Sequence, residues 1–467
     1  MDMRLLKDSL GIKELFAITQ NDILCNTSYP FSPKFFEQYK SSQDIMANTD
    51  KIAVYIHIPF CANLCKFCEY TRFSNEDKTK ERAYISLLKN QIQQYTATHN
   101  IKSLYGIDVG GGTPTSLSSE NFETLMGIAD ELIKKYPKAT DFEGSIEFSA
   151  STINDDKIRA ISRAGFKRAS TGIQVFNQKM LKENNRRFAS LNRLLKISEA
   201  LKNYGITKLN IDLMYGLPQQ TVEMLKDTMD AINVLKPEQV TLYETRYNMN
   251  GIRGHGINRK TLFDQYNLLF TRLLDMGYKA RFGQNTFSKE NDEGVSSYLK
   301  HRMYDGIAYK GFGISAQSMS RTGISYNSLK SCKEIHMPHI DEIREQDNYL
   351  LPPEEIAAKY VSIALYSARF SLGVLSDIVG TSALNYYKDE FDFLQEGEYI
   401  SVIDNDCYLT QKGFMYYGAV ASMFWSRTHK ARYLLLREKE ASLNAQNQSR
   451  QIPPSPRARL HHGTSGN

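Results

Sequence analysis

Cysteine is scarce in this sequence, with 6 among 467 residues, and long apolar runs are missing. No apolar run approaches the ~20 residues that a membrane-spanning helix requires. The first residues also lack the apolar segment and small-residue cleavage site of a secretory signal. We therefore expect a cytoplasmic protein without a membrane partner, long enough for one large domain and a smaller one.

An excess of charge of one sign is also lacking from most of the chain. The net charge is +6, but residues 427–467 hold eight Lys or Arg and two Asp or Glu, which leaves 50 cations and 50 anions elsewhere. A neutral main body argues against a nucleic-acid partner. Residues 427–467 are poor in apolar side chains and are predicted to form a basic, disordered tail.

Three of the six cysteines lie within eight positions, in the segment YIHIPFCANLCKFCEY of residues 55–70. A structural zinc site usually takes four Cys or His ligands in two pairs, and the remaining cysteines stand alone. Three cysteines spaced C-x3-C-x2-C suit a 4Fe-4S cluster bound at three irons, with the fourth iron open to a non-protein ligand. The spacing therefore predicts that Cys61, Cys65 and Cys68 bind an iron-sulfur cluster.

Strand and helix patterns alternate after the cysteines. Apolar strand-like runs at 51–60, 103–111, 145–150, 167–176, 207–216 and 239–246 are each followed by an amphipathic helical pattern, at 81–97, 118–136, 154–165, 189–203, 221–235 and 261–277. Six βα units predict an α/β fold, a partial (β/α)6 barrel whose site lies at the carboxyl ends of the strands.

These motifs resemble the radical S-adenosylmethionine (SAM) enzymes, and among them the oxygen-independent coproporphyrinogen III oxidase-like (HemN-type) family. The resemblance covers residues 25–430 and rests on TSYPFSPKFF, YIHIPFCANLCKFC, GGGTPTSL, GIQVFN, NIDLMYGLPQQT, GFGISAQSMS and LTQKGFMYYGAVASMFW. It implies a radical SAM barrel with an N-terminal extension and a small, mostly helical C-terminal domain.

The resemblance also implies a division of the chain into five parts. They are an N-terminal extension (1–50), the partial barrel (51–285), a connecting segment (286–350), the C-terminal helical domain (351–426) and the tail (427–467). Residues 351–380 are expected to be helical. Residues 398–424 are expected to form a short hairpin and then a helix that begins near Thr410.

By the same resemblance, the cofactors are a 4Fe-4S cluster on Cys61, Cys65 and Cys68 and SAM bound to the open iron. An electron from the cluster then breaks the sulfonium bond of SAM and leaves a 5'-deoxyadenosyl radical that removes hydrogen from the substrate. First-site SAM contacts are expected from the backbone of Gly111 and Gly112, from Glu147 and from Tyr55, which is also a candidate catalytic residue.

A second SAM molecule is expected as well, because residues that match the family's second site are present. These residues are Phe67, Gly112, Thr113, Gln174, Arg186 and Asp212. Carboxylate, guanidinium and amide groups from different βα units suit a zwitterionic amino acid that carries a ribose.

Three residues depart from the family pattern. Tyr70 replaces a cysteine that the decarboxylase carries two positions after the last cluster cysteine, Arg246 replaces a small residue, and Gln317 replaces an aliphatic residue. Large polar groups at these positions put coproporphyrinogen in doubt as the substrate. Arg246 and Gln317 are predicted to contact a polar group of the substrate as candidate catalytic residues.

The resemblance leaves three functions open: decarboxylation of coproporphyrinogen III in the porphyrin pathway, radical C-methyl transfer or cyclopropanation, and haem binding as a chaperone. The first two require a small-molecule substrate and a reducing electron donor such as flavodoxin or ferredoxin. The third requires a haem ligand, for which His301, His336 and His339 are the candidates. The chain is expected to be a monomer.

Overall fold

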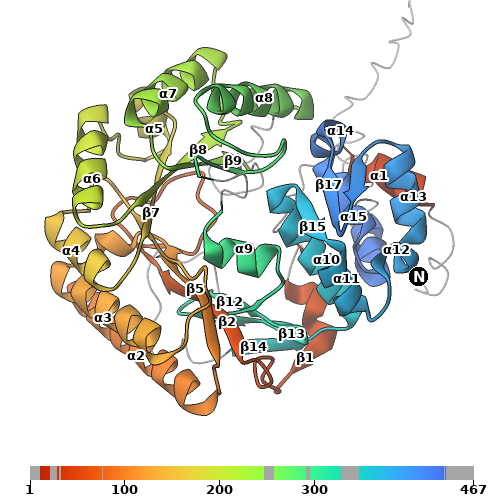
Figure 1. The fold of residues 1–467 in the computed structure, drawn as a ribbon, viewed down its shortest axis with the longest axis horizontal. Helices are drawn as coiled ribbons and strands as arrows, with labels where there is room; N and C mark the ends of the chain where they lie inside the picture. The colour runs from red at the N-terminus through yellow and green to blue at the C-terminus, as the bar shows by residue number, and fades with distance from the viewer. Residues whose placement is uncertain are drawn as a thin grey trace, which may run out of the picture.

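The computed structural model describes residues 11–20, 29–30, 33–75, 77–246, 257–290, 295–327, 346–435 and 437. Its main feature is a curved sheet whose outer face is covered by helices, with the C-terminal part of the chain at its open side (Figure 1). Among the described helices, none combines the length and apolar character needed to cross a bilayer.

Six βα units build the curved sheet, as the sequence predicts. The strands are β2 (Lys51–Ile58), β5 (Ser103–Gly111), β6 (Gly144–Phe148), β7 (Arg168–Gln174), β8 (Lys208–Tyr215) and β9 (Gln239–Glu244), and each pairs in parallel with the next. The helices that follow them are α2 (Lys78–Thr98), α3 (Ser119–Lys135), α4 (Asp155–Arg163), α6 (Leu191–Asn203), α7 (Val222–Leu235) and α8 (Arg259–Asp275). The short α5 (Gln178–Glu183) lies between β7 and α6.

Apolar packing explains why these runs become strands. Seven of the eight residues of β2 are buried or half-buried, because one face of the sheet meets the outer helices and the other meets the barrel interior. In sequence, parallel strands that are covered on both faces appear as continuous apolar runs, without alternation of apolar and polar residues. The polar side chains that these strands do carry are therefore exceptions, and most of them line the site.

Residues 286–350, expected as a connecting segment, extend the sheet. β10 (Thr286–Ser288) pairs antiparallel with β9 at one edge, and β11 (Ala308–Phe312) pairs in parallel with β2 on the other side. From β11 the sheet continues antiparallel through β12 (Gln317–Met319), β13 (Gly323–Asn327), β14 (Gln346–Leu350) and the N-terminal β1 (Lys40–Ser41). β2 is thus an interior strand of this sheet.

The C-terminal elements form a second core. They are α10 (Pro353–Ala364), α11 (Leu372–Val379), α12 (Ala383–Tyr386), α13 (Lys388–Glu396), α14 (Gln411–Met415), α15 (Tyr417–Met423) and a small sheet of β15 (Arg369–Ser371), β17 (Asp406–Leu409) and β16 (Ile400–Ile403). The hairpin and the Thr410 helix cap agree with the sequence prediction. β15 interrupts the region expected to be helical, because its backbone completes the hairpin by pairing with β17.

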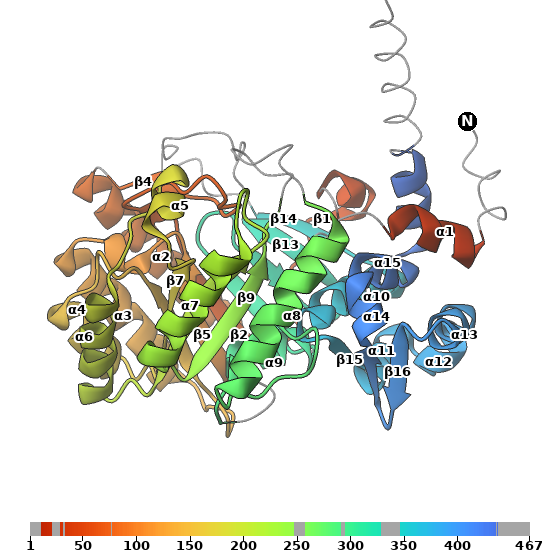
Figure 2. The same ribbon diagram turned by 90° about the horizontal axis from the view of Figure 1, so that it is seen from above.

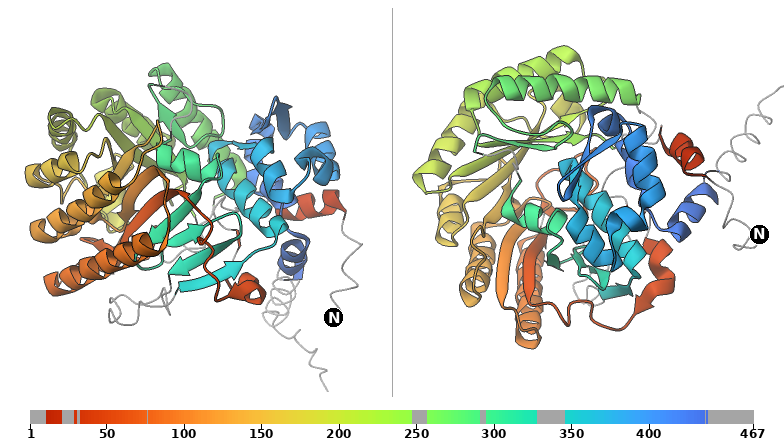
Figure 3. Two further views of the ribbon diagram at one scale, coloured as in Figure 1. Left: turned by 60° about the horizontal axis from the view of Figure 1, so that its bottom comes forward. Right: turned by 45° about the vertical axis from the view of Figure 1, so that its right-hand side comes forward.

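The N-terminal and C-terminal parts of the chain pack together. α1 (Ile12–Thr19) lies against α15, and the Thr19 and Ser422 hydroxyls are hydrogen-bonded at 3.1 Å (Figure 2). In the right-hand view of Figure 3 the C-terminal elements stand at the open side of the curved sheet, beside α9 (Ser297–Met303). The barrel interior is therefore bounded by the C-terminal part of the chain as well as by the strands.

Candidate active site

A cavity of about 1310 Å³ occupies the interior of the curved sheet and reaches the carboxyl ends of its parallel strands. Every residue that the sequence predicts for the cluster, SAM and substrate lines this one cavity: Tyr55, Cys61, Cys65, Phe67, Cys68, Gly111, Gly112, Thr113, Glu147, Gln174, Arg186, Asp212, Arg246 and Gln317. These residues come from most of the βα units and from β12, so the fold brings together groups that are distant in sequence. The role of each residue is a separate question.

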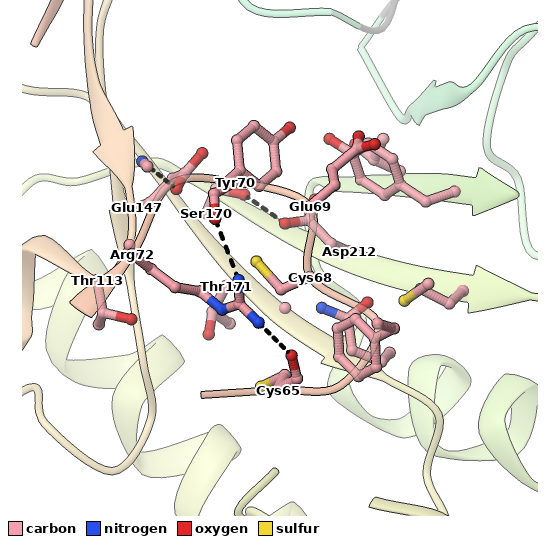
Figure 4. A pocket seen from close by; sticks show the side chains of 18 of the residues that line it. Cys65, Cys68, Glu69, Tyr70, Arg72, Thr113, Glu147, Ser170, Thr171 and Asp212 are labelled. Carbon is pink, nitrogen blue, oxygen red and sulfur yellow. Dashed lines mark hydrogen bonds between the residues drawn. The ribbon is translucent and has the colours of Figure 1, made fainter. Parts of the chain in front are cut away.

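The three cysteines surround one region of this cavity. Cys61 ends β3 (Phe60–Cys61), and Cys65 and Cys68 lie on the loop that follows it. All three are free thiols, and two of them are buried. Arg72 donates a 2.6 Å hydrogen bond to the Cys65 carbonyl (Figure 4). Arg186 reaches to 3.5 Å from the Cys65 sulfur. Guanidinium groups therefore flank the thiols.

Residues 62–72, here called the cluster loop, are held by segments from distant parts of the chain. The Thr71 carbonyl lies 2.9 Å from His57 Nε2, and the Thr71 hydroxyl donates a 2.9 Å hydrogen bond to Ser315. On the opposite side, the Asn185 amide donates to the Leu64 carbonyl at 2.9 Å. These contacts fix the loop that presents the cysteines against β2, against the end of α5 and against the turn before β12.

A glycine segment passes beside the cysteines. Gly111 ends β5 with φ = +110°, and a Cβ atom there would lie 2.4 Å from the His57 ring. A Cβ atom on Gly112 would lie 2.7 Å from the Phe60 carbonyl oxygen. Only glycine fits both the backbone angle and the space at Gly111. The neighbouring Thr113 places its hydroxyl 3.7 Å from the Cys61 sulfur.

The close approach at Gly111 leads to a stability prediction. We expect Gly111→Ala to lower the free energy of unfolding by about 1–3 kcal/mol or more, because the new methyl group meets both an unfavourable φ and the His57 ring. Gly127 lies inside α3, and no atom lies within 4 Å of the place that a methyl group would take there, so Gly127→Ala should raise it by about 0.5–1 kcal/mol. Urea unfolding of both variants tests this contrast. Equal effects at the two positions would contradict it.

Three carboxylates from neighbouring strands face the cavity: Asp108 on β5, Glu147 on β6 and Asp212 on β8. Glu147 accepts a 3.0 Å hydrogen bond from the Gly111 amide. Burial, together with the charges of Asp108 and Asp212, raises the pKa of Glu147 to about 8. Burial raises the pKa of Asp108 to about 6, with Arg168 acting in the opposite direction. Near neutral pH, Glu147 is therefore the carboxyl group of this pair that keeps its proton.

The raised pKa of Glu147 predicts how stability depends on pH. Between its ordinary value of 4.5 and about 8, the folded protein keeps a proton on Glu147 that the unfolded chain releases. Stability therefore falls as pH rises through this window. Glu147→Gln removes this contribution while Asp108, Asp212, Arg168 and Tyr55 remain around it. We expect the Tm of this variant, relative to the wild type, to be higher at pH 8.5 than at pH 5. A constant difference across this range would contradict the assignment.

The residues predicted for a second SAM molecule lie on the β7 and β8 side of the cavity. Gln174 has φ = +70° beside an irregularity in the β7–β8 pairing, an unusual backbone for a residue with a side chain. Arg186 donates a hydrogen bond to the Gly172 carbonyl. Asp212 accepts hydrogen bonds from Asn210 at 2.7 Å and from Ser170 at 3.3 Å. The carboxylate is thus held in a fixed orientation by its own sheet.

The residues that depart from the family pattern also lie in the cavity. Arg246, just beyond β9, forms an ion pair with Glu69 of the cluster loop, and each side chain is about one quarter exposed. Tyr70, the next residue of the cluster loop after Glu69, has 54% of its surface exposed. Gln317 begins β12, opposite Tyr326. The ion pair with Glu69 therefore ties Arg246 to the cluster loop.

Tyr55, the predicted catalytic residue on β2, has its hydroxyl 3.2 Å from His57 Nδ1.

Several polar groups of the cavity were not predicted. Arg168 donates to Gln239 at 2.8 Å and to Ser145 at 2.9 Å, deep between the strands. Arg302 of α9 packs on the Tyr309 ring at 4.2 Å. Together with Asp108 and Arg72, these residues line the same cavity. A charged residue inside an apolar strand pattern, as in YGIDVGG, is a signal that could have identified Asp108.

Of the three histidines predicted as haem ligands, the structure describes only His301. His301 lies in α9 with Nδ1 at 2.6 Å from Asp305 and Nε2 at 3.0 Å from Asp141. Both ring nitrogens are therefore engaged by carboxylates. His336 and His339 lie outside the described residues.

Comparison with known proteins shows which proteins the chain is similar to. A profile described as the radical SAM superfamily matches residues 55–232, which contain the cysteine motif and the strands from β2 to β8. This part of the chain resembles the radical SAM superfamily, and we call the protein HemN-like because its fold is similar to that of HemN. The superfamily uses a 4Fe-4S cluster and SAM. The solved structure of coproporphyrinogen III oxidase (HemN) from Escherichia coli matches the HemN-like chain with a TM-score of 0.66 and 21% identity, over 80% of this chain and 90% of that one.

Curated relatives of the HemN-like chain carry two kinds of name. Coproporphyrinogen III oxidase, anaerobic 1, of Cereibacter sphaeroides is 33% identical over 46% of this chain, and the match spans about half (48%) of that protein. The oxygen-independent coproporphyrinogen III oxidase of Salmonella typhimurium is 28% identical over 68% of this chain and 72% of its own length. Heme chaperone HemW of Lactococcus lactis is 29% identical over 59% and 72%. The names thus include both an enzyme and a chaperone.

The cavity of the HemN-like chain fits an iron-sulfur cluster in its donor chemistry. Burial raises the pKa of Cys61 to about 12 and also raises the pKa of Cys68, while the Arg72 charge lowers both. Such thiols lose their protons when a metal binds them. In the described part of the chain, no three His, Cys, Asp or Glu side chains form a site for a single metal ion. Cluster thiolates bind separate irons and need not converge on one point.

Proposed function

We propose that this chain is a radical SAM enzyme in which Cys61, Cys65 and Cys68 hold the 4Fe-4S cluster. The observation that carries the proposal is that three free thiols, flanked by guanidinium groups, share one cavity with a glycine segment and a carboxylate cluster. When bound, the cluster supplies the electron that cleaves SAM and so yields a 5'-deoxyadenosyl radical able to abstract substrate hydrogen. The remaining roles belong to the residues of the chain.

The first SAM molecule is proposed to lie along the glycine segment. Gly111 and Gly112 line the cavity, and their missing side chains let this backbone pass close to His57 and Phe60. Glu147, already oriented by the Gly111 amide, would accept hydrogen bonds from ribose hydroxyls. Tyr55, on β2 beside this segment, would border the SAM molecule on the side of the barrel interior. Because ribose hydroxyls favour the charged carboxylate, SAM binding is expected to release the Glu147 proton.

A second SAM molecule is proposed on the β7 and β8 side. The fixed Asp212 carboxylate and the Arg186 guanidinium offer opposite charges to a zwitterion, and the strained Gln174 backbone aims an amide into the cavity. Phe67 and Thr113 border the same space. Strain of this kind at the end of a strand supports a functional role rather than a packing role.

The first candidate reaction is the oxidative decarboxylation of coproporphyrinogen III. The names of the relatives and the HemN-like fold support it. The second candidate is C-methyl transfer or cyclopropanation, which Tyr70 and the Glu69–Arg246 ion pair favour, since they change the groups next to the cluster loop. The chaperone function relies on the HemW relatives, and His301 contributes no haem ligand because both its nitrogens are engaged.

An anaerobic assay separates these functions. The reconstituted protein receives dithionite, coproporphyrinogen III and SAM labelled on its methyl group, and the products are analysed by mass spectrometry. Loss of two carboxyl groups together with 5'-deoxyadenosine supports the decarboxylase. Intact porphyrinogen together with S-adenosylhomocysteine and 5'-deoxyadenosine supports methyl transfer. No SAM cleavage by a protein that retains its cluster would overturn the enzyme proposal and favour the chaperone.

A further inference from the structure

Four exposed cations gather beside the cluster loop. They are Lys66 on the loop itself, Lys179 and Lys182 on α5, and Arg187 just after α5, and we call them the basic face. None of the four has an ion-pair partner among the described residues, whereas some exposed cations elsewhere, such as Arg82 and Arg163, are paired with Glu120 and Glu123. One exposed carboxylate, Glu183, accompanies them on α5. The basic face thus has an uncompensated positive charge.

The basic face is joined to the cysteines by direct contacts. The Lys66 amide donates a 3.1 Å hydrogen bond to the Asn184 carbonyl at the end of α5, and Asn185 donates to the Leu64 carbonyl. Arg186, between Asn185 and Arg187, reaches the Cys65 sulfur. The residues at the end of α5 are therefore in direct contact with the cluster loop.

We propose that the basic face is the docking surface for an acidic one-electron carrier protein. This inference rests on the proposed function, since a cluster that cleaves SAM must receive one electron in each turnover. The carrier loses that electron and the cluster gains it, and no bond forms or breaks between the proteins. A surface rich in carboxylates complements four unpaired cations, and opposite charges accelerate encounter most at low ionic strength.

The charge balance explains why the partner is a protein rather than a nucleic acid. Outside residues 427–467 the chain holds equal numbers of cations and anions, so its overall charge does not favour a phosphate backbone as the partner. The basic face is small and lies directly against the loop that carries Cys65 and Cys68. A compact electron carrier can bind a face of this small size and place its redox centre over the cluster loop.

The test compares two sources of electrons. Lys179→Glu/Lys182→Glu reverses the charge of the α5 part of the face, and it leaves the cluster loop unchanged. The matched control, Lys134→Glu/Lys388→Glu, makes the same change in charge on α3 and α13, where both lysines are exposed. SAM cleavage is measured with dithionite and with enzymatically reduced flavodoxin at low salt. Binding of oxidised flavodoxin is measured by titration calorimetry.

We expect the α5 variant to lose at least about tenfold in flavodoxin-driven SAM cleavage and in flavodoxin affinity. Its dithionite-driven cleavage should stay within about twofold of the wild type, and the control should keep both rates. An equal loss in the control, or unchanged flavodoxin affinity in the α5 variant, would overturn the proposal. If the wild type cleaves no SAM even with dithionite, the proposed function fails, while the calorimetric titration still reports on docking.

Discussion

Cys65→Ser is expected to abolish SAM cleavage and to strip the protein of most of its iron after reconstitution. Cys65 is buried, its sulfur lies near Arg186, and its carbonyl is held by Arg72, so no other thiol of the described chain can take its place. A hydroxyl is a poor ligand for cluster iron compared with a thiolate. The loss in activity should exceed about a hundredfold, the effect that removal of a mere supporting partner of a metal ligand can reach.

The control for this prediction is Cys407→Ala. Cys407 is also a buried free thiol, but it lies on β17 in the small C-terminal sheet. Its removal should leave iron content, visible absorbance and SAM cleavage close to those of the wild type, at the cost of some stability. Iron retained by Cys65→Ser, or lost equally by both variants, would show that Cys65 does not bind the cluster.

Breaking the ion pair between Arg246 and Glu69 is expected to loosen the cluster loop. Because both side chains are about three-quarters buried, removing either one removes a partly buried charge pair that joins the cluster loop to the end of β9. We expect Arg246→Leu and Glu69→Leu each to speed iron loss to a chelator by about tenfold, which corresponds to about 1.4 kcal/mol. The charge-exchanged variant Glu69→Arg/Arg246→Glu should restore the slower rate.

The exposed pair Arg163 and Glu123 provides the control, and Arg163→Leu should not change iron retention. The measurement also separates two roles for Arg246. The sequence predicts a substrate contact, and the structure shows a tether to the cluster loop. If Arg246→Leu keeps its iron and raises only the KM for substrate, the substrate role is correct and the tether is incidental.

The sequence is sufficient to predict the six βα units because strands buried on both faces leave long apolar runs, as in residues 51–60. The resemblance to the radical SAM enzymes also predicted residues that share a cavity in the structure, where the carboxyl ends of parallel strands meet at one edge. The short strands β12 and β15 were not predicted. They hold three residues each, and their pairing depends on partners that the local sequence does not indicate.

The ion pair at Arg246 illustrates a second limit. A large cation next to a predicted substrate site suggests a ligand contact, and nothing near Arg246 in sequence identifies Glu69 as its partner. Arg168 is similar, because its hydrogen bonds reach Ser145 and Gln239 on two other strands. Contacts of this kind are set by the register of the sheet. They become visible only when the strands are placed side by side.

The position of β11 limits how the chain can be divided. The superfamily profile ends at residue 232. However, one edge of β2, the strand that leads to the cysteines, pairs with β11 at Ala308–Phe312. Thr71 of the cluster loop also bonds to Ser315. A fragment that stops at the profile boundary would expose one edge of β2 as an apolar template for pairing with other chains. It would be prone to aggregate. During synthesis, the pocket for the cysteines is therefore complete only after Ser315 has emerged, and we expect cluster insertion to follow that point.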